Sequence, residues 1–434
     1  MRKIKDDVCK KLGINTANCF PIGFFGDGVP HTKHKTIEVM SWNILSIPDS
    51  ERFPFVVIEK QFCCKCGCGG RHTLEPFLQV FCWSMRALIE GVWPKHRHDR
   101  EPWSKTDAWR QKQDGPLPAH AVVAQIRGDW AYYKQLFGFP AWSNRCICWL
   151  CPANKDEASH PFWNFKAHAS WRHHRYTIAE FWRLMHLMGV AKSCIFELPG
   201  VTLAMVTIDP LHAMDLGFSQ DLLGNVLWEF QKCGLCPGSN VKDRVAALWL
   251  KLKAHYIALG TPNRIQALTV EMLKMDKKGP KLRTKGAETR SLVPFGLVCA
   301  KEMYEHDPSP HNEAVFHCMS ALMDLYLLLS LPVWNPSAAS TACRRCLVHY
   351  QALSEEMRKA DRPLFWRIKP KAHMFCELGE YMHEHMGNPS LFWNYKDEDF
   401  VGYISRIAHP RGGPRQASST GKAVLERYSA LKSL

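Results

Sequence analysis

The chain has 434 residues, of which 46% are hydrophobic and 22% are charged. This composition excludes a disordered or fibrous chain, and the length allows two or three domains or one domain with a large insertion. Lys and Arg outnumber Asp and Glu by 56 to 41, which gives a formal net charge of +15. Such an excess favours a polyanionic partner, either nucleic acid or an anionic membrane surface.

The chain contains no uninterrupted apolar stretch of the roughly 18 residues that a membrane span needs. The best candidate, residues 321–331, is shorter and includes Asp324. The charged N-terminal segment is not followed by an apolar one, and no Asn-x-Ser/Thr site has a permitted middle residue. We therefore expect neither a membrane partner nor secretion. The chain has 18 cysteines. Because we expect a reducing compartment, we interpret close cysteine pairs as metal ligands or packed side chains and not as disulfides.

Residues 17–139 have the pattern of a mixed α/β segment. Three short apolar strands are expected in succession, at residues 19–26, 36–42 and 53–58. Residues 74–93 carry apolar side chains at helical spacing, and a further strand is expected at residues 121–126. The resulting order, β-β-β-α-β, is that of the ribonuclease-H-like fold, although composition and periodicity leave other α/β folds open.

Residues 211–364 have an almost purely helical pattern. Helices are expected at residues 214–231, 241–259, 265–275, 293–304, 314–329 and 342–358. The linker at residues 274–290 holds seven Lys or Arg, which predicts either a solvated, mobile loop or an arm that follows a DNA backbone. Residues 369–410 return to a mixed pattern.

Two acidic residues stand where predicted strands end. Asp27 follows the first apolar strand between two glycines, which let a ligand approach the backbone closely. Asp129 follows the fourth strand in the same way. Either residue alone is equally typical of an Asx turn. Together, on neighbouring strands, two such carboxylates can hold the divalent cations that nucleases and polymerases use.

The arrangement of these residues in the chain resembles that of eukaryotic cut-and-paste DNA transposases of the DDE class, most of all the CACTA type. It also shares the layout of the Transib-like antigen-receptor recombinase. Asp27 fits the first acid of that family and Asp129 the second, and Cys148 and Cys151 fit the Cys-x-x-Cys that follows it. The resemblance implies an α/β fold, namely a ribonuclease-H-like (DDE) catalytic core interrupted by a large all-α insertion.

The third acid of the family, a Glu, comes late in the chain. Residues 393–410 are similar to that motif, which makes Glu398 the third carboxylate. The family usually has Arg after this Glu, whereas here Asp399 follows and Asp397 precedes it. The match to the family motif can therefore be displaced by one residue, to Asp397 or Asp399. Asp215 is a rival third acid.

Asp209 and His212 fit the family's Asp-x-x-His signature. The resemblance implies that they position DNA or the active site, and the plainer interpretation of His212 is a histidine at a helix start. The implied domains are the first part of the core with the Cys-x-x-Cys segment, the α-helical insertion, the end of the core with the third carboxylate, and a C-terminal tail. Their boundaries are residues 17–210, 211–365, 366–412 and 413–434.

Cys148 and Cys151 have the spacing of half a structural zinc site. In the related recombinases histidines before the late Glu supply the other half, and His373 fits the first of them. The second histidine is replaced by Leu378. The fourth position would then fall to Cys376, His383 or His385. The alternative is two packed cysteines and a surface histidine.

A denser cysteine cluster lies in residues 62–70. Its members are Cys63, Cys64, Cys66 and Cys68, with His72 or Cys82 nearby. A second zinc site is possible there, but the spacing commits no particular set of ligands.

The function that the resemblance implies is metal-dependent strand cleavage and strand transfer at transposon ends. Asp27, Asp129 and Glu398 would hold Mg²⁺ or Mn²⁺. The partners would be double-stranded DNA, both transposon ends and target, and a second copy of the chain, in the nucleus. The alternatives are a structure-selective nuclease of the same fold and a catalytically silent, domesticated DNA-binding protein.

Overall fold

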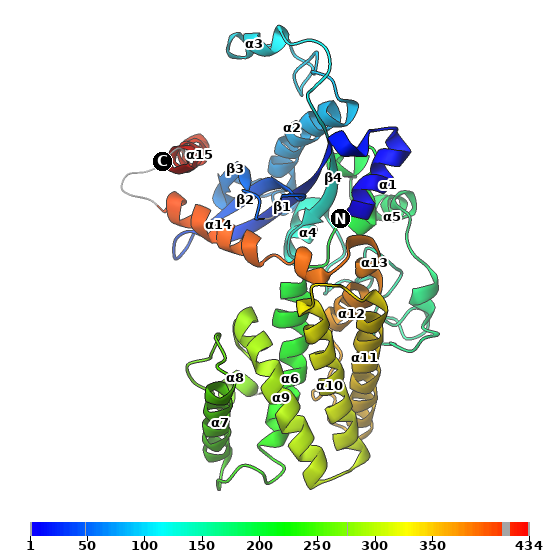
Figure 1. Ribbon diagram of the computed structural model, residues 1–434, viewed down its shortest axis with the longest axis vertical. Helices are drawn as coiled ribbons and strands as arrows, with labels where there is room; N and C mark the ends of the chain where they lie inside the picture. Colours follow the sequence, from blue (N-terminus) through cyan, green and yellow to red (C-terminus); the bar gives the residue numbers. More distant parts are fainter. Residues whose placement is uncertain (1, 48, 276, 410–416, 433–434) are drawn as a thin grey trace. The chain divides into compact units, whose positions relative to one another are not determined.

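The computed structural model describes residues 2–47, 49–275, 277–409 and 417–432 (Figure 1). The chain forms two compact units. Unit 1 comprises Met1–Ala141, Arg175–Thr207 and Asn394–Leu434, and unit 2 comprises Trp142–His174 and Ile208–Trp393. Unit 2 thus consists of two segments inserted into the chain of unit 1. These units and the predicted domains divide the chain differently, because the Cys-x-x-Cys segment and residues 366–393 belong to the helical unit.

Unit 1 is an α/β unit built on a four-stranded mixed sheet, in the order β3-β2-β1-β4. The strands are β1 (Cys19–Pro30), β2 (Thr36–Ile44), β3 (Phe53–Glu59) and β4 (His120–Arg127). Both β1 and β3 pair antiparallel with β2, whereas β4 runs parallel to β1. The predicted strands and the helix between them, α2 (Arg71–Glu90), are confirmed in the predicted order.

A short segment extends the sheet beside β4. Val206 forms a parallel bridge with Ile126, and the Thr207 amide donates to the Ile126 carbonyl at 3.0 Å. The Tyr133 hydroxyl lies 2.9 and 2.8 Å from the carbonyls of Ile126 and Thr207. This buried tyrosine therefore ties the segment to the edge of the sheet.

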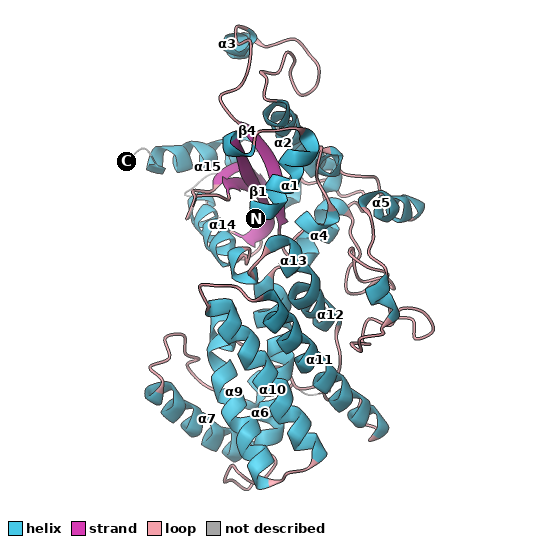
Figure 2. Cartoon of the chain, turned by 45° about the vertical axis from the view of Figure 1, so that its right-hand side comes forward, coloured by secondary structure: helices cyan, strands magenta, loops and turns pink. Residues whose placement is uncertain are grey.

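Helices cover both faces of the sheet, so unit 1 has three layers (Figure 2). On one face Phe24 packs against Phe81 of α2, with ring centroids 5.6 Å apart. The helix α4 (Trp130–Phe137) lies on the same face, where a Cβ at Gly26 would come within 2.3 Å of the Tyr132 ring. The opposite face packs against α14 (Tyr395–Ala408) and α15 (Ala417–Lys432). Its core includes Phe25, Val39, Val57, Val401, Ile404 and Val424.

The other helices of unit 1 are peripheral. They are α1 (Arg2–Leu12), α3 (Ala108–Gln111) and α5 (Ile178–Leu187). Short 3₁₀ turns in this unit span Thr16–Asn18, Lys60–Phe62, Lys105–Asp107, Cys194–Glu197 and Leu203–Met205.

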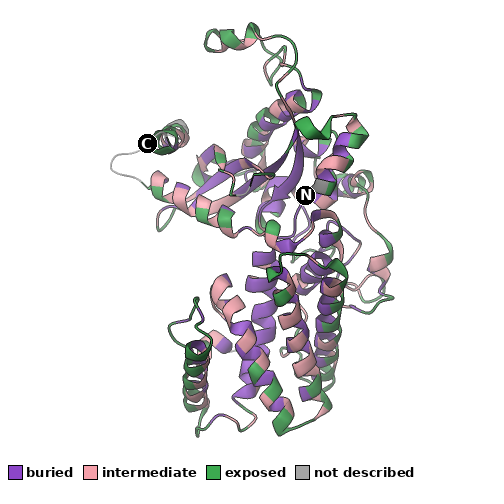
Figure 3. Ribbon diagram, viewed as in Figure 1, coloured by how far each residue is buried: buried purple, intermediate pink, exposed green. Residues whose placement is uncertain are grey.

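Unit 2 is a helical bundle around α6 (Ser219–Phe230), whose residues are buried almost all round (Figure 3). A helix that is buried on every side forms the core of a bundle. The long neighbours are α9 (Gly286–His306), α10 (Pro310–Ser330) and α11 (Pro336–Lys359). The remaining α-helices are α7 (Val241–Ala258), α8 (Val270–Leu273), α12 (Pro370–Glu377) and α13 (His383–Met386). Short turns span Leu211–Phe218 and Leu378–Met382, which are π-helical, and Ser170–His173 and Pro389–Leu391.

The helical predictions are confirmed except in two places. The helix expected at residues 214–231 begins as a π-helical turn, and the one expected at residues 265–275 shortens to α8. The mixed pattern expected for residues 369–410 is wrong, because the elements described there are helical. The apolar residues of this segment are buried on α12 and α14. Its sequence pattern looks irregular because the helical segment is interrupted at Gly387.

The basic linker at residues 274–290 contacts the bundle around residues 281–283. The Lys281 amide donates to the Leu273 carbonyl, and the Leu282 amide donates to the Gln220 carbonyl, both at 2.8 Å. Leu282 is fully buried, and a Cβ at Gly224 would come within 2.4 Å of the Lys281 Cα. One apolar anchor, Leu282, therefore holds this part of the segment on α6, whereas Lys277 and Lys278 are exposed.

By length and composition α10 is apolar enough to cross a membrane, the one such helix among the described residues. It packs in the bundle between α9 and α11. A core helix passes the same test, so this finding is weak evidence for a span.

Candidate active site and metal centres

The sheet brings Asp27 and Asp129 to neighbouring positions. The parallel register of β1 and β4 pairs Phe25 with Arg127, so Asp27 and Asp129 each follow two residues after that pair. Asp129 follows the end of β4, but Asp27 does not end β1 as expected, because pairing with β2 continues the strand to Pro30. Both side chains are partly exposed. The carboxyl ends of parallel strands are a common place for a ligand site.

Each of the two carboxylates also has a local structural partner. Asp27 Oδ1 accepts from the Gly28 amide at 2.7 Å. Asp129 is the N-cap of α4, and its Oδ1 accepts from the Tyr132 amide at 2.6 Å. The cap fixes the Asp129 side chain where β4 ends and α4 begins, because an N-cap carboxylate satisfies an amide that has no partner within the helix.

Glu398 lies in the first turn of α14, which packs on β1. Its neighbours differ sharply in environment: Asp397 is fully buried, Glu398 is partly exposed and Asp399 is exposed. Asp397 is held by two arginines, with Arg52 Nε 2.6 Å and Arg127 Nη1 3.3 Å from its carboxylate oxygens. The three crowded carboxylates therefore have separate environments, and the buried one is engaged in ion pairs.

The Arg127 guanidinium is enclosed at the end of β4. It also donates to the Asn43 side chain, and a Cβ at Gly23 would lie 2.9 Å from one of its terminal nitrogens. Burial lowers the pKa of Arg127, and the Asp397 carboxylate opposes that shift. The Arg127 guanidinium is thus buried between the sheet and the start of α14, and the sequence patterns did not indicate this ion pair.

Asp215, the rival third acid, lies in unit 2. It is buried in the π-helical turn Leu211–Phe218, with its Oδ2 2.5 Å from Arg290 Nη2, and it accepts a hydrogen bond from the Tyr326 hydroxyl. Burial and the Asp215 carboxylate raise the pKa of Tyr326. This environment is that of an ion-paired carboxylate inside a helical bundle.

Asp209 and His212 contact each other at the start of the same turn. Asp209 Oδ2 lies 2.6 Å from His212 Nδ1 and accepts from the His212 amide at 3.2 Å. Its Oδ1 accepts from the Leu211 amide at 3.1 Å. The Asp-x-x-His pair therefore closes the first turn of a helix, as in the plainer interpretation of His212.

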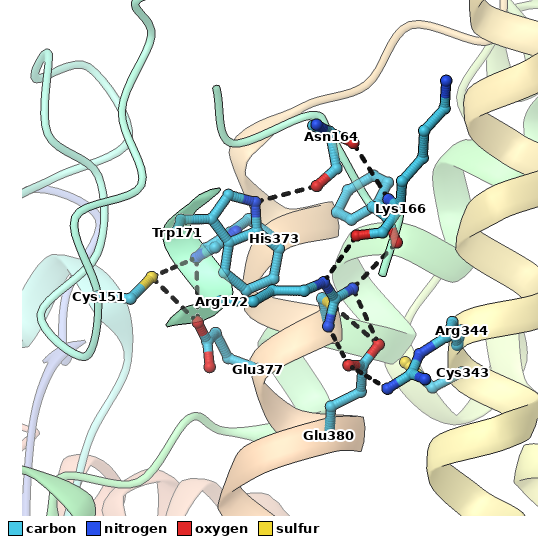
Figure 4. A network of polar contacts seen from close by, with 12 residues as sticks. Cys151, Asn164, Lys166, Trp171, Arg172, Cys343, Arg344, His373, Glu377 and Glu380 are labelled. Carbon is cyan, nitrogen blue, oxygen red and sulfur yellow. Dashed lines mark hydrogen bonds and ion pairs between the residues drawn. The ribbon is translucent and has the colours of Figure 1, made fainter. Parts of the chain in front are cut away.

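A four-residue cluster that can hold a metal lies inside unit 2. It consists of Cys148, Cys151, His373 and Glu377, whose ligand atoms all lie within 4.8 Å of one another. Each residue is at most 1% exposed. The Cys151 sulfur lies 3.3 Å from His373 Nε2 and 3.1 Å from Glu377 Oε1 (Figure 4). Two thiolates, an imidazole and a carboxylate form a donor set that suits tetrahedral zinc.

The predicted trio of Cys148, Cys151 and His373 is thus brought together, and the fourth member is a residue that the sequence did not indicate. Neither Cys376, His383 nor His385 belongs to the cluster. Glu377 takes the place instead, because it lies four residues after His373 on α12 and so shares its face. That i, i+4 spacing was the available signal.

The charges of this buried cluster are coupled. Burial raises the pKa of the Cys148 thiol, but hydrogen bonds with Cys151 and His373 outweigh it and lower the pKa to about 6. Burial lowers the pKa of His373, whereas Cys148 and Glu377 outweigh it and raise the pKa to about 9. The thiolate is the form of cysteine that binds metal, so the cluster favours a bound cation.

A second layer of contacts supports the histidine. The Trp171 ring packs edge-on against His373 with centroids 4.6 Å apart. Arg172 follows it and forms an ion pair with Glu380, one turn after Glu377 (Figure 4). These contacts join the segment Trp142–His174 to the helix that carries half of the cluster, so both halves are held in place without the metal.

A second cluster that can hold a metal such as zinc lies in unit 1, between β3 and α2. It consists of Cys64, Cys66, Cys68 and His72. Of the other residues considered, Cys63 is buried beneath the loop and Cys82 is buried on α2. These two clusters are the ones found among the residues that the structure describes.

A scan against protein-family models finds no match for this chain, and a search of curated proteins finds none either.

Proposed function

We propose that the chain is a DDE-type DNA transposase that cleaves and joins DNA strands with divalent metal ions. One observation carries the proposal. Asp27, in the C-terminal part of β1, lies next to Asp129, which follows the end of the parallel strand β4, and the helix that bears Glu398 is anchored to the end of β4 through Asp397 and Arg127. The packing of α14 on β1 supports a site to which all three acids contribute.

The topology of unit 1 supports the same proposal. Three antiparallel strands followed by a fourth strand parallel to the first, in the order β3-β2-β1-β4, match the start of a ribonuclease-H-like core. The described elements of residues 208–393, which precede the α14 segment in the chain, are helical. This arrangement fits an α-helical insertion before the last acid, as the sequence resemblance implies.

The donor set suits Mg²⁺ or Mn²⁺, because three carboxylates offer the hard oxygen ligands that these ions prefer. Asp27, Asp129 and Glu398 would hold them. When bound, such ions lower the pKa of an attacking water or 3′-hydroxyl and stabilise the departing oxygen. A reaction of this kind needs no covalent protein nucleophile.

The chain's own residues orient the site. The N-cap hydrogen bond fixes the direction of the Asp129 carboxylate, and the paired arginines around Asp397 fix the first turn of α14. The net charge of +15 attracts DNA phosphates, so binding is expected to weaken steeply with salt and to depend weakly on sequence. The proposed partners are double-stranded DNA and a second copy of the chain, in the nucleus.

A strand-transfer assay tests the proposal. The substrates are pre-cut duplexes with randomised terminal sequences and a supercoiled plasmid, in Mg²⁺ or Mn²⁺. The expected result is joined product from the full chain and none from Asp129→Asn, a variant that keeps the helix cap because Asn caps as well as Asp. Cutting without joining would instead indicate a nuclease. Salt-sensitive DNA binding without metal-dependent chemistry would indicate a catalytically silent protein.

A further inference from the structure

The cluster between β3 and α2 is built from a single short loop. Its four possible ligands, Cys64, Cys66, Cys68 and His72, have their ligand atoms within 4.8 Å of one another. The His72 Nδ1 lies 3.3 Å from the Cys66 sulfur and 4.0 Å from the Cys64 sulfur. Zinc bonds of about 2.3 Å to sulfur and about 2.0 Å to nitrogen place tetrahedral ligand atoms about 3.5 to 3.8 Å apart. The existing separations need only small adjustments to receive an ion.

The main chain shapes this loop without help from a metal. Gly67, Gly69 and Gly70 have φ values of 93°, 67° and 93°, a conformation that residues with a Cβ rarely adopt. The Cys64 amide donates to the Thr73 hydroxyl at 2.8 Å, which folds the loop back on the first turn of α2. The loop therefore brings three alternate residues, Cys64, Cys66 and Cys68, close to His72 in the first turn of α2.

The two clusters differ in exposure. In the buried cluster of unit 2 all four side chains are enclosed, whereas in this loop Cys66 and His72 are exposed and Cys64 and Cys68 are half-buried. A chelator or thiol reagent can reach the ligands of the loop directly, but can reach those of the buried cluster only after local opening of the fold.

We propose that Cys64, Cys66, Cys68 and His72 bind one zinc ion that clamps the β3–α2 connection, and that this ion exchanges faster than one at the buried cluster. The site is independent of the proposed catalysis. Three thiolates and an imidazole form a closed structural donor set, with no position left for a reacting water. Its effect is on the loop and on the start of α2, where the N-cap residue Gly70 has no side chain to cap the helix.

Zinc content of the purified full chain gives the first test. The expected result is two zinc ions per chain for the natural sequence, and one for the double variant Cys66→Ser with His72→Asn. Cys146→Ser is the matched control, because this exposed cysteine lies outside both clusters, and it should retain two ions. A natural chain with one ion that survives the double variant would overturn the proposal.

The second test uses the natural chain alone, so it does not depend on how a variant folds. A chelator with a colorimetric zinc indicator should release one ion in a fast phase and the other in a slow phase. Hydrogen exchange during the fast phase should rise at residues 60–75 and stay unchanged at residues 148–151 and 370–377. Release in one phase, or a fast phase that leaves residues 60–75 unchanged, would contradict the proposal.

Cobalt substitution distinguishes the sites by ligand type. Thiolate-to-cobalt charge-transfer absorption grows with the number of bound sulfurs, so a three-thiolate site absorbs more strongly than a two-thiolate site. The double variant should therefore lose more than half of this absorption. A loss of less than half would show that the loop does not supply three sulfurs.

Discussion

The Arg127 guanidinium lies 3.3 Å from the Asp397 carboxylate in the interior of unit 1, although the two residues are 270 positions apart in the sequence. Arg127 is the last residue of β4, and Asp397 is in the first turn of α14. The pair therefore fixes the helix that bears Glu398 relative to the strand that leads to Asp129. Arg52 contacts the same carboxylate, which gives the buried acid two cationic partners.

The first prediction concerns this anchor. Asp397→Asn leaves the Arg127 guanidinium buried without its counter-charge, so the free energy of unfolding should fall by about 3 to 5 kcal/mol. Asp399→Asn, a change two residues away on the exposed side of the same helix, should change it by less than about 0.5 kcal/mol. Urea unfolding followed by tryptophan fluorescence measures both. Equal stability of the two variants would contradict the anchoring role.

The second prediction separates Glu398 from its neighbours and rests on the proposed function. Glu398→Gln removes a metal-binding charge from a partly exposed side chain, so strand transfer should fall at least about a hundredfold while the unfolding transition stays unchanged. Asp399→Asn should retain normal activity. Loss of activity in Asp399→Asn with normal activity in Glu398→Gln would indicate that Asp399, and not Glu398, is the third acid.

The sheet of unit 1 and its helix α2 were predictable because their signals are local. Three apolar runs, an amphipathic helix and a fourth strand are each visible in a short window of sequence, and the structure has them in the same order. The helix breaks within residues 369–410 were not predictable in this way. In that segment one π-helical turn and Gly387 interrupt the apolar pattern, so the helical periodicity is not visible in the sequence although the chain is helical on both sides.

Contacts between residues far apart in the sequence were harder to predict. Nothing near Arg127 in the sequence indicates Asp397, because their pairing arises only when α14 packs on the sheet. Glu377 was missed for a different reason. The search for a fourth zinc ligand considered cysteine and histidine, whereas the helical spacing from His373 selects position 377 whatever residue stands there.

The third prediction concerns Asp215. Asp215→Ala removes the partner of Arg290 and of the Tyr326 hydroxyl inside unit 2, so the free energy of unfolding should fall by about 2 to 4 kcal/mol. Asp324→Ala removes an exposed ion pair with Arg345 on the same bundle and should cost less than about 1 kcal/mol. Denaturant unfolding measures both. A stable Asp215→Ala variant without strand transfer would revive Asp215 as the third acid.

The fourth prediction concerns the buried cluster. Glu377→Ala removes one of four candidate ligands, so zinc affinity at this cluster should fall at least about a hundredfold. Glu384→Ala, at an exposed acid of α13, should leave zinc affinity unchanged. Competition with a zinc-binding dye measures both constants. Unchanged affinity in Glu377→Ala would show that Glu377 is not a ligand.

The last prediction follows from His311, which links three helices of unit 2. Its Nε2 lies 2.9 Å from Glu229 on α6, and its Nδ1 lies 2.9 Å from Glu356 on α11. Burial lowers the pKa of His311, but the two carboxylates outweigh it and raise the pKa to about 9. The folded protein therefore binds the proton more tightly than the unfolded chain does, and protonation stabilises the fold.

This stabilisation should be complete below about pH 6.5 and disappear as the pH rises to about 9, with a total effect of roughly 2 to 3 kcal/mol. His311→Gln cannot gain the charge, so the difference in unfolding free energy between the natural chain and this variant should shrink over that interval. His317→Gln is the control, since its contact with Glu313 is exposed and longer, at 3.8 Å. Urea unfolding at pH 6.5, 7.5 and 9 measures the differences. A difference between the natural chain and His311→Gln that is the same at all three pH values would show that the proton is not held by the two glutamates.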